Sequence, residues 1–299
     1  MILTILTGMI LRCALACGVL TLGVATTAPA ATPSRPLIVA GVSEWGVLAH
    51  QLVGNQAKVE ILLSDPNADP HEHEATVHDA GYVALASVVI ENGAGYDNWL
   101  NKLVAVSQPH VAVVNVASLL GVRVGANPHL FYSPRAAVRF VKALSTLLAH
   151  HDPHLHLASR ARALDAALGA VSRRVAAIKA SCHGVRVAAT EDVATRLLQQ
   201  AGLDVVTPES LRLAVSNGVD PSISSLATAL QQLQQRPAFL LNNVQTSTPL
   251  TQTMVARARG DGVALVNVTE TMRGTNYVTF LNEVVNQISR ALGHEGCLA

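Results

Sequence analysis

The sequence has little charge and few aromatic residues. Only 14% of its 299 residues are charged and 3% are aromatic, whereas about 25% of the residues of an average soluble protein are charged. The formal net charge of +1 is not gathered into basic blocks. Binding to nucleic acid needs clustered cations for the phosphates or aromatic rings for the bases, so we expect no nucleic-acid partner.

The first thirty residues are apolar and almost uncharged. They contain a single charge, Arg12, followed by about a dozen apolar residues and the small residues Ala28-Pro29-Ala30. This apolar stretch is shorter than the ~20 residues that span a bilayer, and the pattern is typical of a secretory signal peptide. We predict a signal peptide over residues 1–30, cleaved after Ala30. The alternative is an uncleaved anchor; a lipidated Cys17 is disfavoured because no leucine stands three residues before it.

Cysteine is scarce as well, with four in the chain. Cys13 and Cys17 would leave with the signal peptide, so Cys182 and Cys297 remain. We expect a periplasmic or other extracytoplasmic location, where conditions are oxidising and a disulfide can form. The sequence does not give the separation of their Cα atoms, so two separate thiols remain an open alternative.

Short β-rich runs alternate with longer helical patterns from Pro36 onward. Four strands are expected in the first half and four in the second, over residues 37–42, 59–63, 86–90, 111–116, 185–190, 203–206, 238–241 and 263–269. Alternation of this kind predicts α/β layers with largely parallel sheets.

The stretch between the halves has no strand pattern. From Leu157 to Ile178, apolar residues recur every three or four positions, as in an amphipathic helix. We expect one helix of some thirty residues, about 40 Å long, starting after Asp152-Pro153 and ending near Gly184. It is either a core helix of one domain or a bridge, and the two four-strand sets favour the bridge.

The predicted fold class is therefore α/β, with two lobes joined by one long backbone helix. Each lobe is a mainly four-stranded parallel sheet flanked by helices. After the signal peptide, the expected organisation is an N-terminal lobe over residues 31–150, the linking helix over 151–183 and a C-terminal lobe over 184–299.

Four residues that can coordinate a metal follow strands of these sheets. His71 and His129 come after strands of the first half, and Glu191 and Glu270 directly follow strands of the second. Ligands of open parallel sheets bind outside the carboxyl ends of the strands. Two neutral imidazoles and two carboxylates also cancel the charge of a divalent cation, so the ion can be buried. Each residue alone has an ordinary explanation as a loop or solvated side chain, and the set is more informative than its members.

The segment "LLSDPNADPHEHEATVHDA…VIENGAGYDNWL" resembles the solute-binding proteins of metal-ion ABC importers, the zinc- and manganese-binding family. "NPHLFYSP", "ATEDVATRLLQQAGL" and "NVTETM" are similar to further segments of that family, in the same order along nearly the whole mature chain. The resemblance implies a single divalent cargo ion, Zn²⁺ or Mn²⁺, bound between the lobes by His71, His129, Glu191 and Glu270.

The chain departs from the family pattern near the first expected ligand. His73 stands where the family usually has an aromatic residue, and Ala75 and Val77 replace two prolines, so we expect a less stiff loop. The long histidine-rich insertion of many zinc importers is absent. We interpret His73 and His78 as solvated loop residues, with weak recruitment of metal as the alternative.

Other polar residues near the expected site have simpler roles. Glu72 and Glu74 would add negative potential that attracts a cation. Asp69 and Asp79 would hold the turns of the loop and cap the following helix. A second histidine cluster at the start of the linking helix is expected to be a surface feature, with an adventitious metal site as the alternative; it comprises His150, His151, His154 and His156.

These observations predict a metal carrier that delivers its ion to a membrane permease, and not an enzyme. A secreted metal-dependent hydrolase is the rival, but catalytic zinc usually keeps one position open for water, and no H-E-x-x-H pattern occurs. A metal-dependent adhesin or metallochaperone on the same fold is a third alternative. The partners expected are the metal ion and the permease, and we expect the chain to be a monomer.

Overall fold

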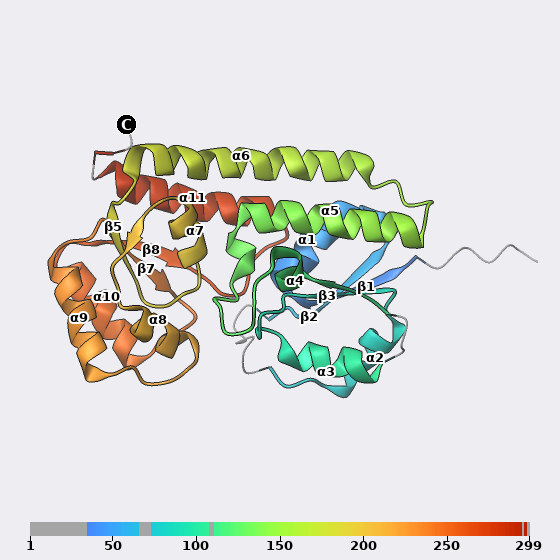
Figure 1. Ribbon diagram of the computed structural model, residues 1–299, viewed down its shortest axis with the longest axis horizontal. Coiled ribbons are helices and arrows are strands. Elements are labelled where there is room, and N and C mark those ends of the chain that lie inside the picture. Colours follow the sequence, from blue (N-terminus) through green and yellow to red (C-terminus); the bar gives the residue numbers. More distant parts are fainter. Residues whose placement is uncertain (1–34, 66–72, 108–110, 295, 298–299) are drawn as a thin grey trace, which may run out of the picture. The chain divides into compact units, whose positions relative to one another are not determined.

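The computed structural model describes residues 35–65, 73–107, 111–294 and 296–297, and these contain two four-stranded parallel sheets (Figure 1). The first sheet has the order β2-β1-β3-β4 and the second the order β6-β5-β7-β8. The strands are β1 (Leu37–Val42), β2 (Lys58–Leu63), β3 (Val88–Glu91), β4 (Ala112–Asn115), β5 (Arg186–Ala189), β6 (Asp204–Val205), β7 (Phe239–Asn243) and β8 (Ala264–Val268). All eight predicted strands, and the α/β class, are confirmed.

Helices cover both sheets. They are α1 (Ser43–Val53), α2 (Val77–Leu85), α3 (Asn98–Val106), α4 (Val116–Leu120), α5 (Pro134–His151), α6 (Ala158–Cys182), α7 (Thr195–Gln200), α8 (Glu209–Ser216), α9 (Ile223–Gln234), α10 (Pro249–Gly260) and α11 (Tyr277–Gly293), with 3₁₀ turns η1 (Gly54–Gln56) and η2 (Leu130–Tyr132). In the part of the chain that the structure describes, no helix is both long and apolar enough to cross a membrane.

The two sheets share one hydrophobic core on their inner faces. Successive side chains of a strand point to opposite faces, so Ile38 and Ala40 of β1 pack into the shared core while Val39 packs into a separate cluster. In the second sheet, Phe239 of β7 belongs to the shared core and Leu240 to another outer cluster. The lobes are therefore packed together through buried apolar side chains, in addition to the connecting chain.

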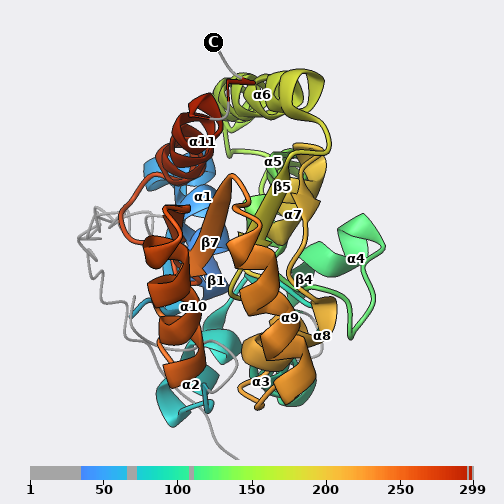
Figure 2. The same cartoon turned by 90° about the vertical axis from the view of Figure 1, so that its left-hand side faces the viewer.

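The helix α6 packs against helices of both lobes. It contacts α1 and α5, which precede it in the sequence, and α7 and α11, which follow it (Figures 1 and 2). Its buried side chains recur at three- and four-residue spacings, as the sequence predicted; they are Leu164, Leu168, Val171, Val175, Ile178 and Cys182. The long backbone helix is thus confirmed.

The predicted start of this helix was wrong. α6 begins at Ala158 and has 25 residues, because residues 152–157 form a separate connection after α5. The carboxylate of Asp152 accepts a hydrogen bond from the backbone N–H of His154 at 3.0 Å, and its carbonyl accepts one from Leu155 at 3.1 Å. These bonds make a turn where a continuous helix was expected.

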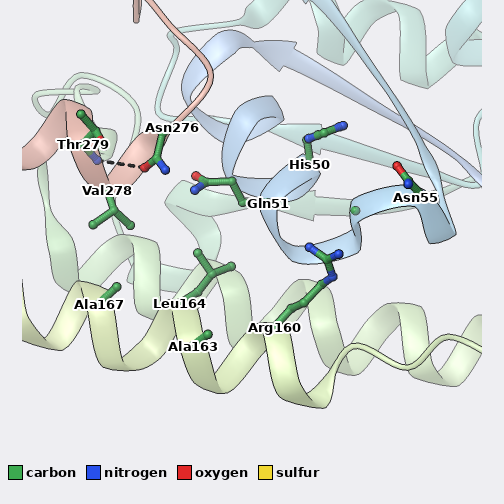
Figure 3. Close-up of a pocket in the computed structure, with 11 residues that line it drawn as sticks. His50, Gln51, Asn55, Arg160, Ala163, Leu164, Ala167, Asn276, Val278 and Thr279 are labelled. Carbon is green, nitrogen blue, oxygen red and sulfur yellow. Dashed lines mark hydrogen bonds between the residues drawn. The ribbon is translucent and has the colours of Figure 1, made fainter.

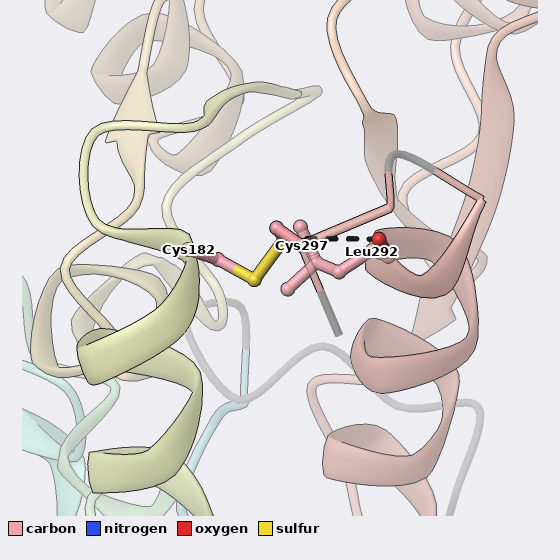
Figure 4. Close-up of a disulfide and its surroundings, with 3 residues drawn as sticks. All are labelled: Cys182, Leu292 and Cys297. Atoms are coloured by element: carbon pink, nitrogen blue, oxygen red, sulfur yellow. Dashed lines mark hydrogen bonds between the residues drawn. A yellow bond between two sulfur atoms is a disulfide. The ribbon is translucent and has the colours of Figure 1, made fainter. Parts of the chain in front are cut away.

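The two cysteines left open by the sequence form a disulfide. Cys182 ends α6 and Cys297 follows α11, with their Cα atoms 5.4 Å apart (Figure 4). The bond joins positions 115 residues apart. A cross-link over so long a loop restricts the unfolded chain strongly, and here it fastens the C-terminal end of the chain to the linking helix.

Candidate metal centre

His129 is fully buried where the segment after β4 enters η2. Asn127 Oδ1 accepts a hydrogen bond from the His129 backbone N–H at 2.9 Å and lies 3.0 Å from its ring atom Nδ1. The rings of Tyr96 and Phe131 pack at its edges, with centroids 5.6 and 5.9 Å away. The imidazole is therefore held in one orientation, with Nε2 on the side away from Asn127.

Glu270 lies at the carboxyl end of β8 and is 5% exposed. The side-chain oxygen of Gln245, which follows β7, accepts hydrogen bonds from the backbone N–H groups of Glu270 and of Thr271, the second at 2.8 Å. Tyr132 donates its hydroxyl to the carbonyl of Thr269 at 2.7 Å. Residues of both lobes thus fix the backbone on which Glu270 stands.

The structure brings His129 and Glu270 into contact. His129 Nε2 lies 2.8 Å from Glu270 Oε1, although the two residues are 141 positions apart. A divalent cation bound at this contact would take one nitrogen donor from the first half of the chain and one oxygen donor from the second.

The other two predicted ligands differ in what the structure says of them. Glu191 follows β5 and is 2% exposed, as a buried coordinating side chain would be. His71 falls outside the described residues. Within the ranges that the structure describes, no three or more His, Cys, Asp or Glu side chains form a group that could hold a metal ion.

A buried acid that the sequence did not single out lies beside the Glu270 segment. Glu44, in the first turn of α1, is 1% exposed, and its Oε1 accepts a hydrogen bond from the backbone N–H of Met272 at 2.6 Å. Burial raises the pKa of Glu44 from its ordinary 4.5 to about 8, and the charge of Glu270 acts in the same direction. Near neutral pH, Glu44 is therefore mainly protonated.

The asparagine of "ENGAGYD" supports the His129 segment from the first lobe. Asn92 donates from Nδ2 to the Pro128 carbonyl at 2.9 Å and accepts from the indole of Trp45 at 2.9 Å. The backbone N–H of Asn92 donates to the carboxylate of Asp97 at 2.6 Å. Burial raises the pKa of Asp97 to about 6. This part of the motif therefore helps to fix the backbone next to His129, the second predicted ligand.

The prediction that His73 is solvated was wrong. Its ring is 17% exposed, lies 3.3 Å from the carboxylate of Asp79 and packs edge-on against Trp99 at 4.4 Å between centroids. Asp79 is at the same time part of a capping box with Thr76 at the start of α2, which confirms the capping role predicted for it. His78 is exposed, as expected.

The second histidine cluster is a surface feature, as predicted. His150, His151, His154 and His156 are all exposed. The rings of the first two lie 6.3 Å apart between centroids. An ion bound by these side chains would lie in solvent, whereas His129 and Glu270 are buried.

Two clefts help to place the candidate centre. A cleft of about 260 Å³ lies beside His129, and residues from both halves of the chain line it, among them Asn98, Asn127, Asp192 and Asn217. Another cleft, of about 650 Å³, lies between α1, α6 and α11 (Figure 3). Among the residues that the structure describes, Arg160 and His50 line it and no carboxylate does, so it offers a cation fewer suitable donors than the cleft beside His129. The cleft beside His129 has polar side chains and one predicted ligand, His129, in its lining.

Sequence reasoning missed Glu44, Asn92 and Asn127. Asn92 and Asn127 lie in the segments that carried the resemblance, so their positions were visible although their partners were not. Glu44 had a weaker signal, a lone carboxylate directly after an apolar strand. Its partner is 228 residues away, and local pattern does not predict such a pairing.

Comparison with known proteins gives a consistent result. The sequence model of the family described as "Zinc-uptake complex component A periplasmic" matches residues 38–291. Among curated proteins, the iron-binding protein YfeA of Yersinia pestis is 27% identical over 113 residues, which is 36% of each chain. In that match the chain spans little more than a third of its relative's length.

Solved structures are similar over most of the chain. The solute-binding protein FpvC of Pseudomonas aeruginosa in complex with Mn²⁺ has a TM-score of 0.70 at 23% identity, covering 88% of this chain and all of that one. The periplasmic zinc-binding protein TroA of Treponema pallidum has a TM-score of 0.70 at 17% identity, covering 87% and 99%. At these identities the likeness shows the fold.

Proposed function

The chain belongs to the zinc-uptake complex component A family of periplasmic proteins, and from that premise we propose that it captures one divalent transition-metal ion outside the cytoplasm and delivers it to the membrane permease of an ABC importer. The cargo is Zn²⁺ or Mn²⁺. The observation that carries the proposal is the 2.8 Å contact between His129 Nε2 and Glu270 Oε1, which joins a predicted ligand from each half of the chain.

The proposed cargo site consists of His71, His129, Glu191 and Glu270. Two observations support it: the last three residues are all buried, and each follows a strand of a parallel sheet. Two imidazoles and two carboxylates also match the charge of a divalent ion, which lowers the cost of burying it. Four protein donors leave no open position for a substrate water, so the chain is a carrier and not a hydrolase.

The remaining parts of the proposal concern processing and assembly. Residues 1–30 are a signal peptide removed after Ala30, and the mature chain consists of an N-terminal lobe to residue 150, the linking segment 151–183 and a C-terminal lobe from 184. The Cys182–Cys297 disulfide supports maturation in an oxidising compartment. The mature protein works as a monomer, which light scattering coupled to size-exclusion chromatography would measure directly.

Deletion of the gene followed by growth under metal limitation tests the transport role. We expect the deletion strain to grow poorly when zinc or manganese is chelated and to take up less of one metal, with recovery on expression of the wild-type chain but not of His129→Ala. An adhesin or a metallochaperone would leave uptake of both metals unchanged, and that result would contradict the proposal. Permease and ATPase reading frames beside the gene would favour the importer.

A further inference from the structure

Asn127 makes hydrogen bonds to both halves of the chain. Its Nδ2 donates to the carbonyl of Asp192 at 2.8 Å and to the hydroxyl of Thr195 at 2.9 Å. Its Oδ1 accepts the backbone N–H of His129. A carbonyl must face the amide nitrogen and an N–H must face the amide oxygen, so these partners leave one orientation for the amide.

This orientation determines where His129 carries its proton. Asn127 Oδ1 can only accept, and it lies 3.0 Å from Nδ1 of the His129 ring, so Nδ1 is the protonated nitrogen. The lone pair that can bind a cation is then on Nε2, the atom that lies 2.8 Å from Glu270 Oε1. Without an acceptor at Nδ1, the neutral ring could place its proton on Nε2 instead and would lose its metal-binding atom.

Residues of the second lobe hold Asn127 in turn. The guanidinium of Arg196, in α7, donates from Nε to the Asn127 carbonyl at 3.0 Å. Thr195 donates its hydroxyl to the Asp192 carboxylate at 3.0 Å, and the same carboxylate is paired with Arg212 of α8. Asp192 and Arg212 are 4% and 7% exposed, and such a buried ion pair is costly unless its groups are well bonded.

We propose that Asn127 is a positioning residue for metal capture: it holds His129 with Nδ1 protonated and Nε2 directed at the ion, and it ties this ring to the second lobe through Thr195 and the Asp192–Arg212 pair. The inference rests on the proposed function for the identity of the ligands. Its consequence is that His129, although its sequence position is in the first half, is held mechanically by the second.

The direct test is the ring nitrogen spectrum of His129 in metal-free protein. Long-range ¹H–¹⁵N correlation distinguishes a protonated from an unprotonated Nδ1, and a His129→Gln variant identifies the signal. We expect Nδ1 to be protonated in the wild type. An unprotonated Nδ1 there would overturn the inference without any further variant being needed.

Variants of Asn127 add the functional readout. In Asn127→Ala we expect the His129 Nδ1 proton to be lost or shared between the ring nitrogens, and the zinc dissociation constant, measured by chelator competition, to rise by about 10- to 100-fold. Asn127→Asp retains an acceptor for Nδ1 but loses the Nδ2 donor to the Asp192 carbonyl, so it should keep the ring signal while recovering only part of the affinity. If Asn127→Ala does not fold, Asn127→Asp is compared with the wild type on both measurements.

The matched control is Asn242→Ala, which removes an asparagine side chain that bonds Asn267 at 3.1 Å outside this network. It should change neither the His129 signal nor the zinc affinity. An Asn127→Ala protein that binds zinc within about threefold of the wild type, or that loses affinity with an unchanged His129 ring, would contradict the positioning role. Failure of the wild type to bind zinc would contradict the proposed function instead, since the ring spectrum needs no metal.

Discussion

The two segments that meet at the candidate centre are each held by the opposite lobe, but by different chemistry. The His129 segment comes from the first lobe and is fixed by Asp192, Thr195 and Arg196 of the second. The Glu270 segment comes from the second lobe and is fixed by Tyr132 and Glu44 of the first. Each lobe therefore helps to place the ligand that the other contributes.

The difference lies in which contacts respond to pH. The bonds that the second lobe makes to the His129 segment involve a backbone carbonyl, a hydroxyl and a guanidinium, none of which titrates near neutral pH. The support with a pKa of about 6, Asp97, acts on this segment from the first lobe through Asn92. On the Glu270 segment, by contrast, one contact is made by Glu44, whose pKa lies at about 8 because it is buried. The inter-lobe contacts of the two segments therefore differ in their response to pH, although both segments are rigidly placed.

The largest effect is expected at Glu44 itself. Its pKa is about 8 in the folded protein against an ordinary 4.5, so the folded state binds the extra proton between these values. The stabilisation from this group is present below pH 4.5 and is lost as pH rises through about 8, a change of roughly 3–5 kcal/mol in the free energy of unfolding.

Glu44→Gln removes this titration while keeping an oxygen that can accept from Met272. Urea unfolding of metal-free protein should therefore show the variant gaining stability over the wild type as pH rises from about 4 to 9. Glu283→Gln, at an exposed position of α11, is the control and should follow the wild type. A Glu44→Gln curve parallel to the wild type would refute the proposed pH sensitivity of the Glu270 side.

Next in size is the loss of a ligand. His129→Ala and Glu270→Ala should each weaken zinc binding at least ~100-fold, since even changes in residues that support metal ligands cost 10- to 100-fold. His71→Ala and Glu191→Ala should do the same. His150→Ala, at an exposed histidine outside the centre, should bind zinc as the wild type does. Calorimetric titration with zinc measures these affinities. Full affinity in both His71→Ala and His129→Ala would show that the site is wrongly assigned.

A smaller effect separates the two candidate metals. Oxygen donors suit Mn²⁺ and imidazole suits Zn²⁺, yet Zn²⁺ should bind more tightly whichever is the physiological cargo, because Mn²⁺ stands at the weak end of the Irving–Williams order. Competition dialysis with elemental analysis should show Zn²⁺ displacing Mn²⁺ at equal concentrations. Glu270→Ala should loosen Mn²⁺ proportionally more than Zn²⁺. Retention of Mn²⁺ against Zn²⁺ would mean that geometry and not ligand type sets the preference.

The fold could be predicted from the sequence because its signals are local. Strands buried on both faces appear as short apolar runs such as "VVI" of β3, and the spacing of apolar residues marks α6 as amphipathic. The start of α6 was missed because Asp152 makes a turn, in which its carboxylate accepts the N–H of His154 and its backbone carbonyl accepts the N–H of Leu155. Boundaries of this kind depend on single hydrogen bonds.

The candidate site was predictable only in part. His129, Glu191 and Glu270 were singled out because ligands gather at the carboxyl ends of parallel strands and because the segments resembled a family. Their supports were not found, since Asn127 bonds residues more than 60 positions away and Glu44 bonds one 228 positions away. The solvation of His73 was misjudged for the same reason, because its partner Trp99 lies on α3.

The smallest expected effect is a change in shape on metal binding. Both sheets share one core, and α6 packs on helices of both lobes, so a wide hinge opening would expose buried apolar surface. Solution scattering should show a change in radius of gyration below about 1 Å when metal is added. A change of several ångströms would show that the shared core does not restrain the lobes. The His129 and Glu270 segments would then not be rigidly placed.

The most direct test of the central claim is anomalous diffraction at the zinc edge from crystals of the zinc-loaded mature protein. We expect one strong peak between the lobes, within about 2.0–2.2 Å of His129 Nε2 and of carboxylate oxygens of Glu191 and Glu270, with His71 as the fourth ligand. A principal peak at the exposed histidines around His150, or one bound by residues of a single lobe, would contradict it.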